Sequence, residues 1–141
     1  MSARPKTEEE RTIERFRERY GRPGSRAQCA VERAGIGASV GSNGYTTIAQ
    51  ADELGRWLRL GSGVRLLDVG CGRGYPGLYL ARETGCSVVA SDLPLFSLRA
   101  GLARATRQRL RRRAAFVAAS AVRLPFRRES FDAIVHTDVL C

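Results

Sequence analysis

Two aspartates and three glycines have the types and spacing of a ligand-binding turn. Asp68 ends a short apolar run, and glycines follow at positions 70, 72 and 74. A second acid, Asp92, closes the next apolar run, 87–91. Glycines lack a Cβ, so the backbone can bend sharply and touch a ligand, and a helix that follows points free N–H groups at the turn. Asp92 can accept two hydrogen bonds from ribose hydroxyls, so the pattern predicts a nucleoside site.

A second pattern lies downstream of the turn. Leu124-Pro125-Phe126 is followed, after three residues, by Ser130-Phe131-Asp132-Ala133-Ile134-Val135. Together with the glycine turn, this segment resembles the class I S-adenosyl-L-methionine-dependent methyltransferases, over roughly residues 45–141. The resemblance implies S-adenosyl-L-methionine as cofactor. It also implies a fold of the α/β class with an open parallel Rossmann-like sheet.

A dinucleotide site is the rival interpretation of the same glycines. Residues 72–77 also satisfy G-x-G-x-x-G, and an acid follows at a suitable distance. Two observations favour the methyl donor. Asp68 stands where a nicotinamide-binding strand is usually apolar, and its charge suits a sulfonium and an ammonium better than a pyrophosphate. A structural strand–turn–helix that binds nothing would need all of these residues to align by accident.

The resemblance also assigns residues to the cofactor. The expected contacts are Tyr45, Thr46, Asp68, Gly70, Cys71, Gly72, Gly74, Asp92, Leu93, Ser120, Ala121 and His136. Ser120 departs from the family, which commonly has an acid there to meet the adenine amino group. A hydroxyl can still accept one hydrogen bond.

The catalytic residue stays unassigned, with His136 and Asp138 as candidates. Both lie just after the fourth expected strand, where the family places groups around the transferring methyl. His136 is the sole histidine, and an imidazole can take a proton near neutral pH. The competing interpretation is that His136 caps the strand or contacts the cofactor. Likewise, Tyr45 and Thr46 either touch the donor's amino-acid end or simply cap a helix.

Composition limits the remaining classes. The chain has 141 residues and 43% hydrophobic content, which suit one globular domain. No apolar run reaches the length of a membrane span, and no secretory signal is visible. The four cysteines have no metal-binding spacing, so we expect free thiols in a reducing cytoplasm and no metal site.

The net charge of +10 is unevenly distributed. Residues 99–113 hold seven arginines and no acid. This run indicates either a phosphate-contacting stripe on nucleic acid or a solvated helix face whose last-turn cations suit the helix dipole. No aromatic residues are interleaved as stacking platforms, which favours the solvated face.

The sequence pattern predicts helices over 8–20, 76–84 and 95–112, and strands over 64–69, 86–91, 114–119 and 131–136. A further helix is expected between Tyr45 and the glycines at 61 and 63, because Ile48, Ala51, Leu54 and Leu58 recur at helical spacing. Residues 21–44 are rich in glycine and predict a linker. We therefore expect a charged helix and linker over 1–44 and a partial cofactor-binding domain over 45–141. The expected strand order is third, second, first, fourth.

The family's sheet has seven strands, whereas this sequence ends just past the fourth. We therefore expect an exposed sheet edge and one uncovered face. Either a homo-oligomer or a partner chain covers that face, or the N-terminal helix folds over it, or the chain is a truncated gene product, which is the simplest of the three. The expected function is methyl transfer to a small-molecule or lipid acceptor. The alternatives are an inert cofactor-binding fragment that acts with a partner chain, and an RNA-associated methyltransferase. The acceptor itself is not readable from the sequence.

Overall fold

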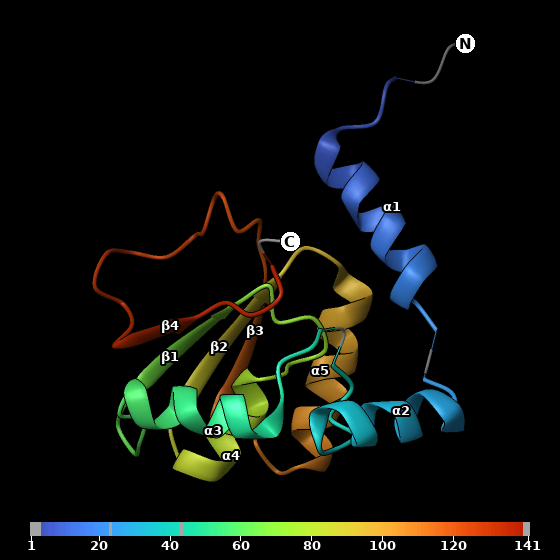
Figure 1. Cartoon of the computed structure of the whole chain (residues 1–141). Coiled ribbons are helices and arrows are strands. Elements are labelled where there is room, and N and C mark those ends of the chain that lie inside the picture. Colours follow the sequence, from blue (N-terminus) through green and yellow to red (C-terminus); the bar gives the residue numbers. More distant parts are fainter. Residues whose placement is uncertain (1–3, 23, 43, 140–141) are drawn as a thin grey trace.

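The computed structural model describes residues 4–22, 24–42 and 44–139 (Figure 1). Its helices are α1 (Glu8–Tyr20), α2 (Arg26–Ile36), α3 (Ile48–Trp57), α4 (Gly77–Thr84) and α5 (Leu95–Arg107). Its strands are β1 (Arg65–Val69), β2 (Ser87–Asp92), β3 (Ala114–Ala118) and β4 (Ala133–Val135). Within the described ranges, no helix is long and apolar enough to cross a lipid bilayer.

The four strands form one parallel sheet in the order β3-β2-β1-β4, which confirms the expected order and fold class. Leu67 pairs with Val89 on one side and with Ile134 on the other. Because all strands run the same way, their carboxyl ends meet at one edge of the sheet. The residues that follow β1, β2, β3 and β4 are therefore gathered along that edge.

The main core lies between the sheet and helices α3 to α5, which Figure 1 shows on one side of it. Leu66 and Val88 point into this layer from the sheet, and Leu78 and Leu80 meet them from α4. Right-handed crossovers bring α4 and α5 to the same face. This layer holds β1 and β2 in place, and the glycine turn starts from β1.

The sequence predicted that the second face of the sheet would be bare, and this prediction is wrong. The loop between β3 and β4 covers that face. Leu67, Val69 and Val89 are at most 8% exposed on this face. Three loop residues, Leu124, Phe126 and Phe131, pack against them, and the two phenylalanine rings meet edge to face at 5.0 Å. The downstream segment that contributed to the family resemblance thus covers this apolar face of the sheet. On the edge strand β4, Ile134 remains 57% exposed.

Helix α2 lies within the stretch 21–44, which the sequence predicted to be a linker. Ser25 accepts a hydrogen bond from the Gln28 N–H, the Gln28 side chain accepts one from the Ser25 N–H, and Gly37 ends the helix at φ 97°. Such a box satisfies free N–H groups locally, so the helix starts in spite of its flanking glycines. The same box starts α1 at Thr7 and α3 at Thr47, so Thr47 caps α3.

Helix α5 ends at Arg107, five residues before the predicted end. Arg109 takes a positive φ of 58°, and the Leu110 N–H donates to the Ala105 carbonyl at 2.8 Å. This tight ending turns Leu110 into the core, where it is 5% exposed. The apolar side chain that extended the helical pattern is therefore a core residue beyond the helix.

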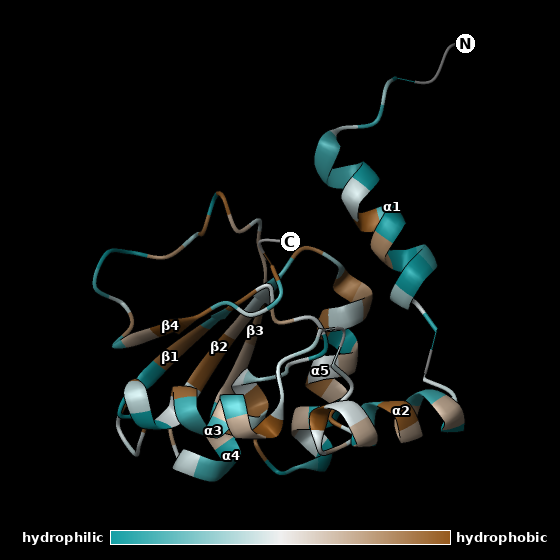
Figure 2. Cartoon of the chain, in the orientation of Figure 1, coloured by the Kyte–Doolittle hydropathy of each residue, from teal (hydrophilic) through white to brown (hydrophobic). Residues whose placement is uncertain are grey.

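Helix α1 extends away from the sheet and is largely hydrophilic (Figures 1 and 2). Its carboxyl end is held by Arg73 from the glycine turn, whose guanidinium donates to the carbonyls of Tyr20 and Arg22. The last carbonyls of a helix lack partners within it, so a guanidinium is a suitable cap. The turn and α1 are thereby connected directly.

We expect Arg73→Ala to release α1 without unfolding the sheet, because the cap is lost while no core contact changes. Limited trypsin digestion should then cut among the arginines of residues 11–22 several-fold faster than in the unmodified chain. The matched control is Arg56→Ala, an exposed position on α3. Equal cleavage rates in the two variants would contradict the role given to Arg73.

Two glycine-to-alanine changes separate close packing from helix propensity. A Cβ at Gly101 on α5 would lie 2.5 Å from Phe116 Cε1 and 3.2 Å from the backbone carbon of Arg73. We expect Gly101→Ala to lower the free energy of unfolding by about 1–3 kcal/mol. At Gly35 on α2 nothing lies within 4 Å, so Gly35→Ala should raise it by up to about 1 kcal/mol. Chemical denaturation measures both, and effects of the same sign would contradict this account.

Candidate functional site

The glycine turn begins where β1 ends and is fastened to β2. The N–H groups of Gly70 and Cys71 both donate to the Ser91 carbonyl, at 2.8 and 3.0 Å. Gly70, Gly72 and Gly74 have φ values of 71°, 53° and 95°. Residues with a Cβ are strained in this left-handed region, so the turn requires glycine at all three positions.

Asp68 is the most unusual polar residue of the site, because it is fully buried at 0% exposure. One of its carboxylate oxygens, Oδ2, accepts a hydrogen bond from the Gly77 N–H at 2.8 Å. The other, Oδ1, is buried with no hydrogen-bond partner among the described residues. Burial, and secondarily the charge of Asp92, raises the pKa of Asp68 to about 7, against the lowering effect of the Gly77 N–H. The oxygen without a partner is a place where a cation or donor would be stabilised.

Asp92 ends β2 and holds the middle of the turn. Its Oδ2 accepts from the Gly72 N–H and its Oδ1 from the Leu93 N–H, both at 2.7 Å. Partial burial raises the pKa of this carboxyl, and the two N–H donors oppose that rise. Each carboxylate oxygen has a second lone pair, so Asp92 can still accept from a ligand.

The glycines of the turn have different neighbours. A Cβ at Gly70 would lie 2.5 Å from Val139 Cγ2, so the segment after β4 lies over this glycine. A Cβ at Gly74 would lie 2.7 Å from Leu78 Cδ1, so this glycine serves the packing of α4. Cys71 is buried at 2% exposure, and burial raises the pKa of its thiol. It is therefore an unreactive part of the turn.

The segment after β4 is clasped to the segment before α3. Asp138 Oδ2 accepts hydrogen bonds from the N–H groups of Tyr45 and Thr46, at 3.0 and 3.3 Å, and from the Thr46 hydroxyl at 3.0 Å. The structure thus brings these sequence-predicted residues together at the carboxyl edge. His136 lies in the same segment and is exposed.

The third part of the predicted site lies beyond β2 and β3. The Ala119 N–H donates to the Asp92 carbonyl at 3.0 Å, which joins the ends of these two strands. Ser120 follows and is half-buried, whereas Ala121 is exposed. The Arg123 N–H closes a turn onto the Ser120 carbonyl at 3.0 Å. Leu93, Ser120 and Ala121 therefore lie along the same edge of the sheet as Asp92.

Sequence reasoning missed Tyr75, which follows the last glycine. Its hydroxyl is buried without a hydrogen-bond partner among the described residues, and burial together with nearby anionic groups raises its pKa to about 12. The ring packs with Ile36 and Ala51. No sequence signal separates such a tyrosine from an ordinary core residue. Gly77 did belong to a recognised pattern, but its role as the donor to Asp68 emerges only from the fold.

No group of three or more histidine, cysteine or acidic side chains that would hold a metal ion is found in residues 4–22, 24–42 and 44–139. Cys29, Cys71 and Cys86 are free thiols. Cys141, the fourth predicted free thiol, lies outside the described residues.

Comparisons with known proteins agree with this geometry. The family model described as a methyltransferase domain matches residues 66–141, just over half of the chain. Methyltransferase GfsG of Streptomyces halstedii is 36% identical over 83 residues, which cover 59% of this chain and 30% of that protein.

Two solved structures share the arrangement of strands and helices. Geranyl diphosphate C-methyltransferase of Streptomyces coelicolor A3(2), in complex with Mg²⁺, geranyl diphosphate and S-adenosyl-L-homocysteine, matches with a TM-score of 0.58 and 26% identity, over 62% of this chain and 33% of that one. The (4+2)-cyclase SpnF matches with a TM-score of 0.54 and 30% identity, over 64% of this chain and 34% of that one.

The chain spans about a third of the length of each of these relatives. The match begins within β1 and includes the glycine turn, Asp92 and the loop that closes the second face of the sheet. The sheet order, the turn and the family match agree, and the chain belongs to the methyltransferase-domain family.

Proposed function

We propose that the chain binds S-adenosyl-L-methionine at the carboxyl edge of β1 and β2 and serves methyl transfer to a small-molecule or lipid acceptor. The observation that carries this proposal is the pair of carboxylates at the turn. Asp68 offers a buried oxygen without a partner, and Asp92 lies at the end of the neighbouring strand. The part proposed to bind the cofactor is residues 45–141.

The charge of this pair supports a methyl donor over a dinucleotide. A buried carboxylate is costly unless a cation or donors compensate it. The ammonium and sulfonium of S-adenosyl-L-methionine would compensate Asp68, whereas a pyrophosphate would add a second anion beside it. Asp92 would accept from the ribose hydroxyls, and Leu93, Ser120 and Ala121 would flank the adenine.

When bound, S-adenosyl-L-methionine supplies an electrophilic methyl group on a sulfonium. The chain's contribution is to hold that group in line with the acceptor and to keep water out, since alignment provides much of the rate in such a displacement. A base is needed only where the acceptor must lose a proton. His136 is our candidate for that role, because Asp138 is engaged in the clasp with Tyr45 and Thr46.

The acceptor is the least defined part of the proposal. One relative is named for geranyl diphosphate, a small apolar chain with an anionic head. That name supports a small-molecule acceptor here. Another relative is named a cyclase, so binding of the cofactor and transfer of its methyl must be tested separately. We further propose the cytoplasm as the compartment, in keeping with free thiols.

Two measurements test cofactor binding and methyl transfer separately. Isothermal titration with S-adenosyl-L-methionine, S-adenosyl-L-homocysteine and NAD tests binding, and binding of NAD alone would overturn the assignment. Transfer of tritiated methyl to a pooled metabolite extract tests activity. Tight binding without transfer would favour the alternative of a cofactor-binding fragment that acts with a partner chain.

We expect Asp92→Ala to weaken S-adenosyl-L-homocysteine binding by roughly 2–4 kcal/mol. The change removes charged acceptors for two ribose hydroxyls and also the acceptor for the Gly72 N–H. The matched control is Asp52→Ala on α3, whose carboxylate accepts from the Tyr79 hydroxyl at 2.6 Å, apart from the turn. Calorimetry measures both variants. If both lose affinity equally, the loss reflects general destabilisation and the role of Asp92 is wrong.

The pKa of Asp68 predicts how stability depends on pH. This carboxyl has an ordinary value of 3.8 and a value of about 7 in the folded chain, so the folded state binds its proton more tightly. The free energy of unfolding should therefore fall as pH rises from about 4 to about 7, by up to about 4 kcal/mol, and this loss should be complete above that range. Denaturation across pH, with Asp68→Asn as reference, measures the difference.

A bound cation should reduce that loss. Because the ammonium of S-adenosyl-L-homocysteine would pair with ionised Asp68, the stabilisation it gives should grow as pH rises through about 7. In the Asp68→Asn variant, the stabilisation by S-adenosyl-L-homocysteine should not increase with pH. Parallel pH profiles for the unmodified chain and Asp68→Asn would show that Asp68 does not titrate in this range.

A further inference from the structure

The whole net charge of the chain comes from one continuous segment. Residues 93–128 contain ten arginines and no acidic residue, whereas the rest of the sequence has fourteen basic and fourteen acidic side chains. This segment comprises α5, β3 and most of the loop after β3. Nine of the ten arginines are exposed, and none of the nine forms an ion pair with another described residue. A polyanionic partner is the expected complement of such a surface.

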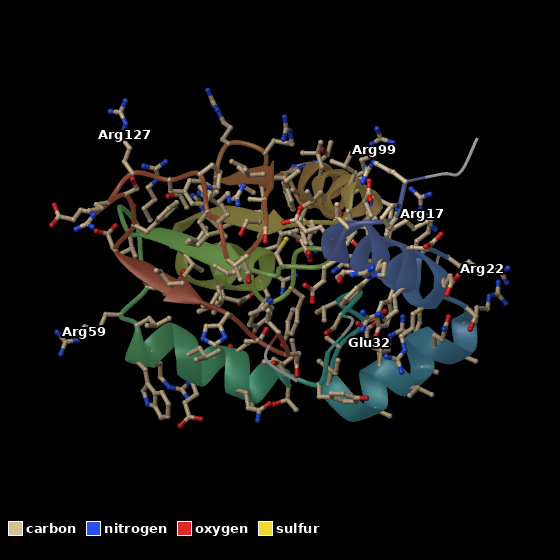
Figure 3. The ribbon with its side chains drawn as sticks, turned by 90° about the horizontal axis from the view of Figure 1, so that it is seen from above. Arg17, Arg22, Glu32, Arg59, Arg99 and Arg127 are labelled. Atoms are coloured by element: carbon tan, nitrogen blue, oxygen red, sulfur yellow. The ribbon has the colours of Figure 1, made fainter. Side chains whose placement is uncertain are left out.

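Five of the nine exposed arginines lie near the amino edge of the sheet. Arg107 ends α5, and the arginines at 109 and 111–113 lie between α5 and β3. Arg99 lies near the start of α5, and Arg123 follows β3. Arg127 and Arg128 lie farther along the same loop, which returns to the start of β1, where the Asp132 N–H donates to the Arg65 carbonyl. Figure 3 shows Arg99 and Arg127 projecting outward on the side of the molecule opposite α3.

Arg99 and Arg123 have exposed apolar neighbours. Leu95 is 56% exposed at the start of α5, and Val122 is 94% exposed. They follow Asp92 and Ala118, which are paired in the sheet, so both lie at its carboxyl edge. Val122 occupies a corner of the turn that the Arg123 N–H closes onto the Ser120 carbonyl. We call Leu95, Arg99, Val122 and Arg123 the carboxyl-edge patch.

The combination favours a lipid surface over nucleic acid. Nucleic acid would use the guanidinium groups but would leave Leu95 and Val122 in water. The phenylalanines of the segment, at 96, 116 and 126, are half-buried and therefore poor platforms for stacked bases. A bilayer with anionic headgroups offers phosphates to the arginines and an apolar layer to the aliphatic side chains.

We propose that the carboxyl-edge patch docks the chain on the surface of an anionic bilayer, with Leu95 and Val122 inserted between headgroups and the arginines on their phosphates. Docking uses neither Asp68 nor Asp92, so it does not depend on methyl transfer. It turns the carboxyl edge of the sheet toward the lipid, where an apolar acceptor would be dissolved.

Vesicle co-sedimentation of the full chain tests docking. The vesicles are phosphatidylcholine alone, or phosphatidylcholine with about one third phosphatidylglycerol, and a tube without vesicles corrects for self-association. We expect at least tenfold tighter binding to the anionic vesicles, and weaker binding as salt is raised. Equal binding to both vesicles, or no binding to either, would overturn the proposal.

Matched variants distinguish the patch from charge in general. Leu95→Glu/Val122→Glu and Arg99→Gln/Arg123→Gln should each weaken binding to the anionic vesicles by on the order of tenfold or more. The controls are Val31→Glu, which is 72% exposed on α2, and Arg59→Gln, which Figure 3 shows beside α3; both should stay within about twofold. All of these positions are exposed, and circular dichroism checks the fold. Equal losses in patch and control variants would overturn the proposal.

Duplex DNA of random sequence serves as competitor. If it binds more tightly than vesicles of equal phosphate content, and Leu95→Glu/Val122→Glu leaves the affinity for DNA unchanged, the surface is a nucleic-acid surface and the lipid proposal is wrong. If the vesicles bind more tightly and the apolar pair is required, the proposal stands.

Discussion

The site depends on two carboxylates that hold one glycine turn by its backbone. Asp92 accepts from Gly72 in the middle of the turn, and Asp68 accepts from Gly77, where α4 begins. The turn is therefore fixed at two points by acceptors from adjacent strands. Both acceptors sit in a partly or fully buried place, where a hydrogen bond to a charged group is strong and its loss is costly. The position of α4, and with it the packed face of the sheet, follows from these bonds.

The parts of the fold set by local pattern were predictable. The strands β1 and β2, the glycine turn and the final order of strands follow from apolar runs, positive-φ glycines and right-handed crossovers. The residues after β2, β3 and β4 could also be placed together, because the carboxyl ends of parallel strands share an edge. The family match later agreed with these expectations.

The parts set by tertiary packing were not predictable in the same way. Helix α2 depends on a capping box within a glycine-rich stretch that suggested a linker. The second face of the sheet looked bare because the loop residues Leu124, Phe126 and Phe131 carry no periodic pattern, yet they pack on it. The Tyr75 hydroxyl and Asp68 Oδ1 are buried without a hydrogen-bond partner because of the residues that pack around them in the folded chain. The identity of these residues does not predict which side chains pack against them.

The clasp of Asp138 on Tyr45 and Thr46 joins residues more than ninety positions apart, yet its acceptor is on an exposed side chain. Closing so long a loop costs conformational entropy, and the parallel pairing of β1 with β4 already brings the two segments to the same edge of the sheet. Breaking solvent-exposed hydrogen bonds requires much less free energy than unfolding the core, so the clasp can open locally while the sheet stays intact. Because Val139 lies over Gly70, each opening uncovers the first glycine of the turn. The first glycine of the turn is thus exposed by breaking three surface hydrogen bonds rather than by unfolding the core.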